Sequence, residues 1–81
     1  MQEGIFTDVV NIIRPHAKNV EGLRNVSLET DIHRDLQVNS TRFVDIVLEF
    51  EDKFGLTISD QDADTIQTVG DAVRLVERLK H

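Results

Sequence analysis

Cysteine and tryptophan are absent from this 81-residue chain, and proline occurs only once. Without cysteine the chain has no disulfide and no thiolate metal ligand, so its stability must come from apolar burial, which is marginal at this length. A reducing compartment is therefore permitted. The single proline and a hydrophobic content of 40% indicate a folded domain rather than a disordered segment. We predict one domain over residues 1–81, with no room for a second core.

Long apolar runs and basic clusters are also missing. The start of the chain, Met1 to Gly4, carries no basic residue, and Asn11 separates the apolar pairs Val9–Val10 and Ile12–Ile13. A signal peptide needs a basic start followed by an apolar stretch, and a membrane-spanning helix needs about 20 apolar residues. We therefore expect a cytoplasmic protein that does not insert into membranes.

Positive charge is scarce: nine basic residues face fifteen acidic ones, giving a net charge of −6. This balance repels a phosphate backbone, so nucleic acid is not an expected ligand. It favours partner proteins with basic docking surfaces. The alternative is that the acidic residues only keep a small protein soluble.

The first helix is predicted from an apolar face that ends close to the proline. It covers about residues 3–15, with Pro15 at its fraying end. The members of the apolar face are Ile5, Phe6, Val9, Val10, Ile12 and Ile13. From His16 to Asn39 the periodicity weakens and polar and apolar residues mix. We predict a long ordered loop there that packs Leu23, Val26, Leu28, Ile32 and Leu36.

The second helix has the clearest signals. Asn39 can cap its start, Phe54 is its last residue, and Gly55 stands where a left-handed residue ends a helix. Apolar residues occupy most of its sides: Phe43, Val44, Ile46, Val47, Leu48, Phe50 and Phe54. Its one polar stripe is formed by Arg42, Asp45, Glu49 and Asp52. We therefore expect this helix at the centre of the fold.

The rest of the chain predicts a short and a longer helix. The segment Asp60 to Ile66 has room for a helical turn or two, and Thr68 followed by Asp71 fits a capping box. The helix after this box should bury Val69, Ala72, Val73, Val76 and Leu79. No strand pattern appears. The fold class is therefore all-α: a small four-helix bundle with a long ordered loop between the first and second helices.

Several stretches of the chain resemble a known protein family. The stretch Asp35–Thr41 (DLQVNST), the helix to Phe54, the run GLTISD that follows it and the pair Thr68–Val69 are similar to the acyl carrier protein family. The resemblance implies that a pantetheinyl transferase attaches 4′-phosphopantetheine from coenzyme A to Ser40. The expected position of Ser40 suits this attachment, because the start of a helix stabilises a negatively charged phosphodiester. An ordinary capping serine is the alternative.

The resemblance also implies a role. The chain would be a monomeric carrier, not an enzyme, that holds acyl groups as thioesters and delivers them to acyl-transferring or acyl-modifying enzymes in fatty-acid, lipid or polyketide-type biosynthesis. The acyl chain would enter an interior lined by Val44, Val47, Phe50, Ile66 and Ala72, unless this is a plain packed core.

Partners with basic surfaces would meet the acidic side of the second helix, where Asp45, Glu51 and Asp52 match acidic recognition positions of the family. The full expected partner surface consists of Asn39, Thr41, Arg42, Asp45, Glu49, Glu51 and Asp52. A solvated helix face with internal pairs, such as Arg42 with Asp45, is the alternative interpretation.

The attachment motif departs from the family pattern. Its Gly-x-Asp-Ser-Leu is replaced by Gln37, Val38, Asn39, Ser40 and Thr41, and Arg42 stands where an acidic residue is usual. Asn39 keeps the capping ability, whereas Arg42 reverses a charge next to the attachment serine. We infer a specialised carrier with dedicated partners. An unmodified helical adaptor of the same fold is the alternative.

A second alternative is a module that binds divalent metal ions. Positions 1, 3, 5, 7, 9 and 12 of a calcium-loop pattern are matched by Asp60, Asp62, Asp64, Ile66, Thr68 and Asp71. The glycine of position 6 is replaced by Thr65, and the glutamate of position 12 by the shorter Asp71. Weak divalent binding is therefore favoured over a calcium sensor, and no metal site is predicted.

Catalytic patterns are weak. Ser40 lacks the flanking glycines of a nucleophile elbow, and His33 and Asp35 lie upstream in a loop without a fixed triad geometry. The spacing of His16, His33 and His81 does not match a zinc site. The sequence therefore favours a binding function over catalysis.

Overall fold

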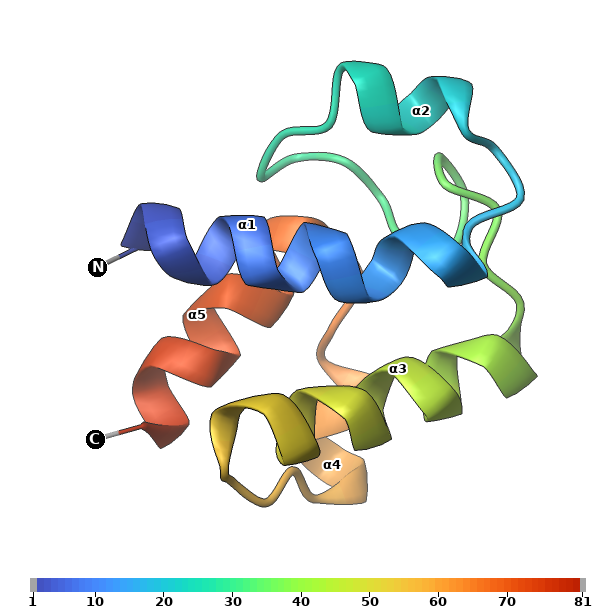
Figure 1. Ribbon diagram of the computed structural model, residues 1–81. Helices are drawn as coiled ribbons and strands as arrows, with labels where there is room; N and C mark the ends of the chain where they lie inside the picture. Colours follow the sequence, from blue (N-terminus) through green and yellow to red (C-terminus); the bar gives the residue numbers. More distant parts are fainter. Residues whose placement is uncertain (1, 81) are drawn as a thin grey trace.

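The computed structural model describes residues 2–80, so His81 lies outside the described residues. The described chain is helical and contains α1 (Gln2–Ile13), a 3₁₀ turn η1 (Arg14–His16), α2 (Glu21–Arg24), α3 (Ser40–Phe54), α4 (Asp60–Asp64) and α5 (Val69–Leu79). Figure 1 shows α5 and α3 below α1, with α2 at the top. Within residues 2–80, no helix is long and apolar enough to span a membrane. The all-α prediction is confirmed.

Pro15 determines how the first helix ends. The prediction placed the end at residue 15, but the α-helix ends at Ile13 and continues as the 3₁₀ turn Arg14–His16. Proline has no N–H to donate and restricts the residue before it, so the regular α-helical pattern cannot pass through it. The tighter turn places His16 against α3, where it contacts Glu49.

The segment predicted as a loop contains the short helix α2. The weak periodicity of residues 16–39 could not reveal four residues of helix. Contacts with the end of the same segment hold α2 in place: Asn19 donates its backbone N–H to Leu36 O and its side-chain amide to Asp35 O. Leu23, Ile32 and Leu36 are buried as expected, whereas Leu28 keeps 37% of its surface exposed. The loop therefore packs largely as predicted.

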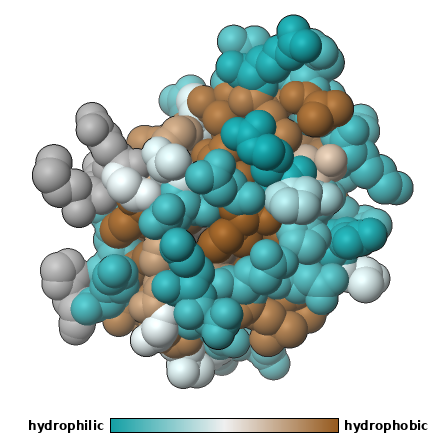
Figure 2. Space-filling model, in the orientation of Figure 1, coloured by the Kyte–Doolittle hydropathy of each residue, from teal (hydrophilic) through white to brown (hydrophobic). Residues whose placement is uncertain are grey.

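Helix α3 begins and ends as predicted. The side chain of Asn39 accepts the N–H of Arg42 at 2.9 Å, and Gly55 adopts a left-handed conformation with φ of 64°. The prediction of apolar contacts on most sides was wrong for Val44 and Leu48, which expose 57% and 56% of their surface. Helix α4 has only five residues, which is too short to cover this second apolar face of α3. Figure 2 shows apolar side chains reaching the surface among hydrophilic ones.

Helix α5 completes the core. Its predicted capping box is present, since Thr68 Oγ1 accepts the N–H of Asp71 and the Asp71 carboxylate accepts the N–H of Thr68. The predicted apolar residues of α5 are buried, except that Leu79 is half-buried. Backbone hydrogen bonds join the start of α5 to the long loop, because Leu28 O and Thr30 O accept the N–H groups of Gly70 and Val69. The core therefore lies between α1, α3, α5 and this loop.

Candidate functional site

Ser40 is the first residue of α3, and it is exposed. The N–H of Arg42 is satisfied by the side chain of Asn39, and the N–H of Phe43 by the backbone oxygen of Asn39. The N–H groups of Ser40 and Thr41 have no acceptor within residues 2–80. Two free donors at the positive end of a 15-residue helix form a suitable environment for an anion attached to Ser40.

Ser40 also faces a hollow of about 320 Å³ between α3, α4 and the long loop. On α3, Ser40, Phe43 and Val44 lie on one face, because residues three and four positions apart are neighbours on a helix. The lining consists of His33, Ser40, Phe43, Val44, Ala63, Asp64 and Ile66. A group attached to Ser40 Oγ would therefore have an apolar floor within reach.

A second hollow of about 260 Å³ adjoins the first. The two share Phe43, Val44, Ala63 and Asp64, and the second extends along α3 past Val47 and Leu48 to Ile58. We call the two together the α3–α4 groove. Of the predicted interior residues, Val44, Val47 and Ile66 line this groove, whereas Phe50 and Ala72 are fully buried in the core.

The predicted partner surface is only partly available. Asp45, Glu49 and Asp52 are exposed, as are Asn39, Thr41 and Arg42. Glu49 contacts His16, whose Nε2 lies 2.6 Å from Glu49 Oε2. The alternative pair of Arg42 with Asp45 is not among the ion pairs of residues 2–80.

Glu51 has an internal role that the sequence did not reveal. It is half-buried, and its Oε2 accepts the backbone N–H of Ile58 at 2.7 Å, which fixes the turn after α3. The acidic side chains of α3 that carry no internal contact are therefore Asp45 and Asp52, within the part of the chain that the structure describes.

Two comparisons bear on this site. The family described as the phosphopantetheine attachment site matches residues 11–76, which is most of the chain. The fold is similar to that of the acyl carrier protein from Enterococcus faecalis, whose structural study concerns its high thermal stability. The similarity has a TM-score of 0.80 and 35% sequence identity, and it covers 98% of each chain. The chain belongs to the acyl carrier protein family.

The cofactor of acyl carrier proteins is 4′-phosphopantetheine, attached covalently at the phosphopantetheine site. The residues here fit such a group, since Ser40 is exposed, two N–H donors are free beside it and an apolar groove begins there. This fit agrees with the cofactor predicted from the sequence.

One departure from the family's attachment motif places a non-glycine residue in a left-handed backbone conformation. Gln37 stands where the acyl carrier motif has glycine, and it has a φ of 55°. A left-handed conformation suits glycine and is unfavourable for a residue with a Cβ atom. The chain thus has a left-handed residue at this position without the glycine that adopts the conformation freely. Asn39, in place of the motif's aspartate, still caps α3 as predicted.

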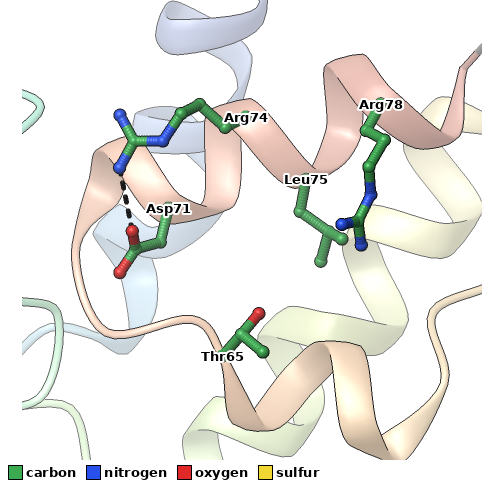
Figure 3. Close-up of a pocket in the computed structure, with 5 residues that line it drawn as sticks. All are labelled: Thr65, Asp71, Arg74, Leu75 and Arg78. Carbon is green, nitrogen blue, oxygen red and sulfur yellow. Dashed lines mark hydrogen bonds and ion pairs between the residues drawn. The ribbon is translucent and has the colours of Figure 1, made fainter.

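The calcium-loop alternative is not supported by the geometry. Asp60–Asp64 forms helix α4, and Asp62 Oδ1 accepts a hydrogen bond from Arg78 at 3.0 Å. Asp71 points to Arg74 in Figure 3, with Asp71 Oδ1 and Arg74 Nη2 at 2.9 Å. Among residues 2–80, no three His, Asp or Glu side chains gather as a metal site requires.

The electrostatics of Asp71 follow from these contacts. Partial burial raises the pKa of Asp71. The N–H donors of Thr68 and Gln67 and the guanidinium of Arg74 outweigh this, so the pKa lies below its ordinary value. Its carboxylate is thus held by the N–H groups of Gln67 and Thr68 and by Arg74, rather than free for a cation.

His33 is the residue of the site that sequence reasoning missed. It was placed in a loop with no fixed geometry, but it lines the hollow that Ser40 faces. Its ring packs at a tilt on Phe43, with ring centroids 4.7 Å apart. No local sequence signal could have found this position, because the fold of the long loop brings His33 to the start of α3.

Proposed function

We propose that this chain carries acyl groups on a 4′-phosphopantetheine arm attached to Ser40 and delivers them to partner enzymes. The observation that supports this most directly is the place of Ser40: exposed, at the start of α3, beside two free N–H groups and facing the α3–α4 groove. The proposed unit is one domain over residues 1–81, acting as a cytoplasmic monomer.

Attachment needs help from a second protein. The Ser40 hydroxyl has no hydrogen-bond partner within residues 2–80, so no side chain described here activates it as a nucleophile. A pantetheinyl transferase would supply the base that takes the proton of Ser40 Oγ as this oxygen attacks the pantetheine-bearing phosphorus of coenzyme A. The phosphoanhydride bond breaks, and the nucleotide phosphate leaves. The N–H groups of Ser40 and Thr41 then face the new phosphodiester.

The α3–α4 groove can bind the acyl chain that the arm carries. When bound, the arm supplies a terminal thiol that holds acyl groups as thioesters. Val44, Val47 and Ile66 give the groove an apolar lining close to Ser40. Each methylene group of an acyl chain removed from water there gains about 0.8 kcal/mol. The groove therefore favours apolar acyl chains, as expected for fatty-acid, lipid or polyketide-type biosynthesis.

The partner surface combines apolar contact with charge. Val44 and Leu48 are exposed one helical turn apart, and Asp45 and Asp52 lie on the same helix without an internal contact. An enzyme with apolar residues flanked by lysine or arginine would complement this surface, and the charges would steer the encounter. Asn39, Thr41 and Arg42 border Ser40 and would contact the part of the enzyme nearest the reaction.

Intact-mass spectrometry tests the attachment. The protein is incubated with coenzyme A and a pantetheinyl transferase of broad specificity, beside the variants Ser40→Ala and Ser27→Ala. We expect one phosphopantetheine adduct on the wild type and on Ser27→Ala, because Ser27 is an exposed serine far from α3 in the sequence, and none on Ser40→Ala. An adduct on Ser40→Ala, or none on the wild type with several transferases, would refute the proposal and favour the unmodified adaptor.

A further inference from the structure

His33 lines the hollow that Ser40 also lines, and it stands on a turn held by hydrogen bonds. The turn that carries it is held by two side chains, since Asp31 Oδ1 accepts the N–H of Arg34 at 2.7 Å and Asp35 Oδ2 accepts the N–H of Asp31 at 2.9 Å. The His33 ring then packs on Phe43, while the residue as a whole remains exposed. His33 and Ser40 therefore face one hollow from two different segments.

The charges around this hollow are unequal. His33 is the only lining residue whose side chain can carry a positive charge, and Asp64 on α4 is the only acidic one. An anion on Ser40 is therefore repelled from the α4 side, where Asp64 lies, and finds a hydrogen-bond donor on the loop side. An imidazole also donates an N–H hydrogen bond in either protonation state.

Other charged groups near these elements do not provide the same contact. Arg34 and Asp35, on the same turn as His33, lie 3.6 Å apart as an ion pair. Arg42 is two residues after Ser40 on α3, and residues at that spacing point to different sides of a helix. Asp60 on α4 lines the second hollow, further along the groove.

We propose that His33 is a positioning residue that hydrogen-bonds the phosphodiester on Ser40 and holds the arm at the entrance of the α3–α4 groove. The inference rests on the proposed attachment at Ser40. The contact gains strength when the imidazole is protonated, because a charged donor binds an anionic acceptor more tightly.

Phosphorus NMR of the modified protein tests this contact. The phosphorus chemical shift responds to the hydrogen bonds that the phosphate oxygens accept, so a change in the shift reports the loss of a neighbouring donor. We expect the signal of the wild type to move in His33→Phe, which retains an aromatic ring to pack on Phe43 but has no N–H donor, and also in His33→Gln, which lacks the imidazole.

His16→Gln is the matched control, because His16 is bound to Glu49 and does not line the hollow. The phosphorus signal of this variant should keep the position that it has in the wild type. A signal that also keeps this position in both His33 variants would overturn the role of His33. Intact mass is measured before the NMR experiment. A wild type without an adduct refutes the attachment at Ser40 instead.

Discussion

Replacing Gly70 by alanine should destabilise the protein, although it removes a glycine from a helix. Gly70 lies in the first turn of α5, and its N–H donates to Leu28 O at 2.8 Å. A Cβ atom at position 70 would lie 2.7 Å from the same oxygen and 3.1 Å from Leu28 Cβ. The blocking atom belongs to the backbone, so a side-chain rotation cannot relieve the contact.

The size of the effect follows from three contributions. Overpacking of a tight site costs about 1–3 kcal/mol. A weakened hydrogen bond between Gly70 and Leu28 adds about 1 kcal/mol. Alanine regains about 1 kcal/mol through its higher helix propensity. The net loss is therefore about 1–3 kcal/mol, which for a domain of this size lowers Tm by roughly 5 °C or more.

Gly4→Ala provides the control for this reasoning. Gly4 lies in α1, and nothing is within 4 Å of a Cβ atom placed there. Alanine should stabilise this helix by about 0.5–1 kcal/mol. Urea and thermal unfolding of both variants should thus give changes of opposite sign. A Gly70→Ala protein as stable as the wild type would show that the loop at Leu28 yields freely, and the argument would fail.

Three further predictions concern the site and its surroundings. Gln37→Gly should raise the free energy of unfolding by about 0.5 kcal/mol, measured in urea, because relief of the left-handed strain exceeds the entropy gained by the unfolded chain. Asp71 has a lowered pKa in the folded state, so its contribution to stability is present above about pH 4 and is lost as the pH falls through the folded pKa. Asp71→Asn should be less stable at pH 7, and its stability should fall less between pH 5 and 2. Leu48→Gln should weaken binding to an acyl-handling enzyme at least threefold with unchanged thermal stability, because Leu48 is exposed.

Local signals explain why α3 and α5 could be predicted. Asn39, Gly55 and the Thr68–Asp71 box act on atoms within a few residues of themselves, so their geometry follows from the sequence alone. Helix α2 has no such signal. Its position depends on Leu36 O and Asp35 O, which approach Asn19 only after the chain has folded back.

The residues of the candidate site also differ in whether local sequence signals could predict them. Ser40 was predicted from the motif and from its position at a helix start, both of which are local. The approach of His33 to Ser40 requires the turn at residues 31–35 and the packing on Phe43. The role of Glu51 also depends on a distant atom, because its carboxylate binds the N–H of Ile58 rather than solvent or a partner.

The internal contacts of Glu49 and Glu51 change the basis of partner recognition. The sequence predicts five charged partner-binding residues on α3, but two of the acidic ones contact His16 and the N–H of Ile58. Within residues 2–80, Asp45 and Asp52 have no internal contact, whereas Glu49 and Glu51 keep their negative charge but are held in place by their contacts. Exposed charge pairs contribute about 0–1 kcal/mol each. Val44 and Leu48 keep more than half of their surface exposed, so their apolar contacts must supply much of the binding energy when a partner covers them.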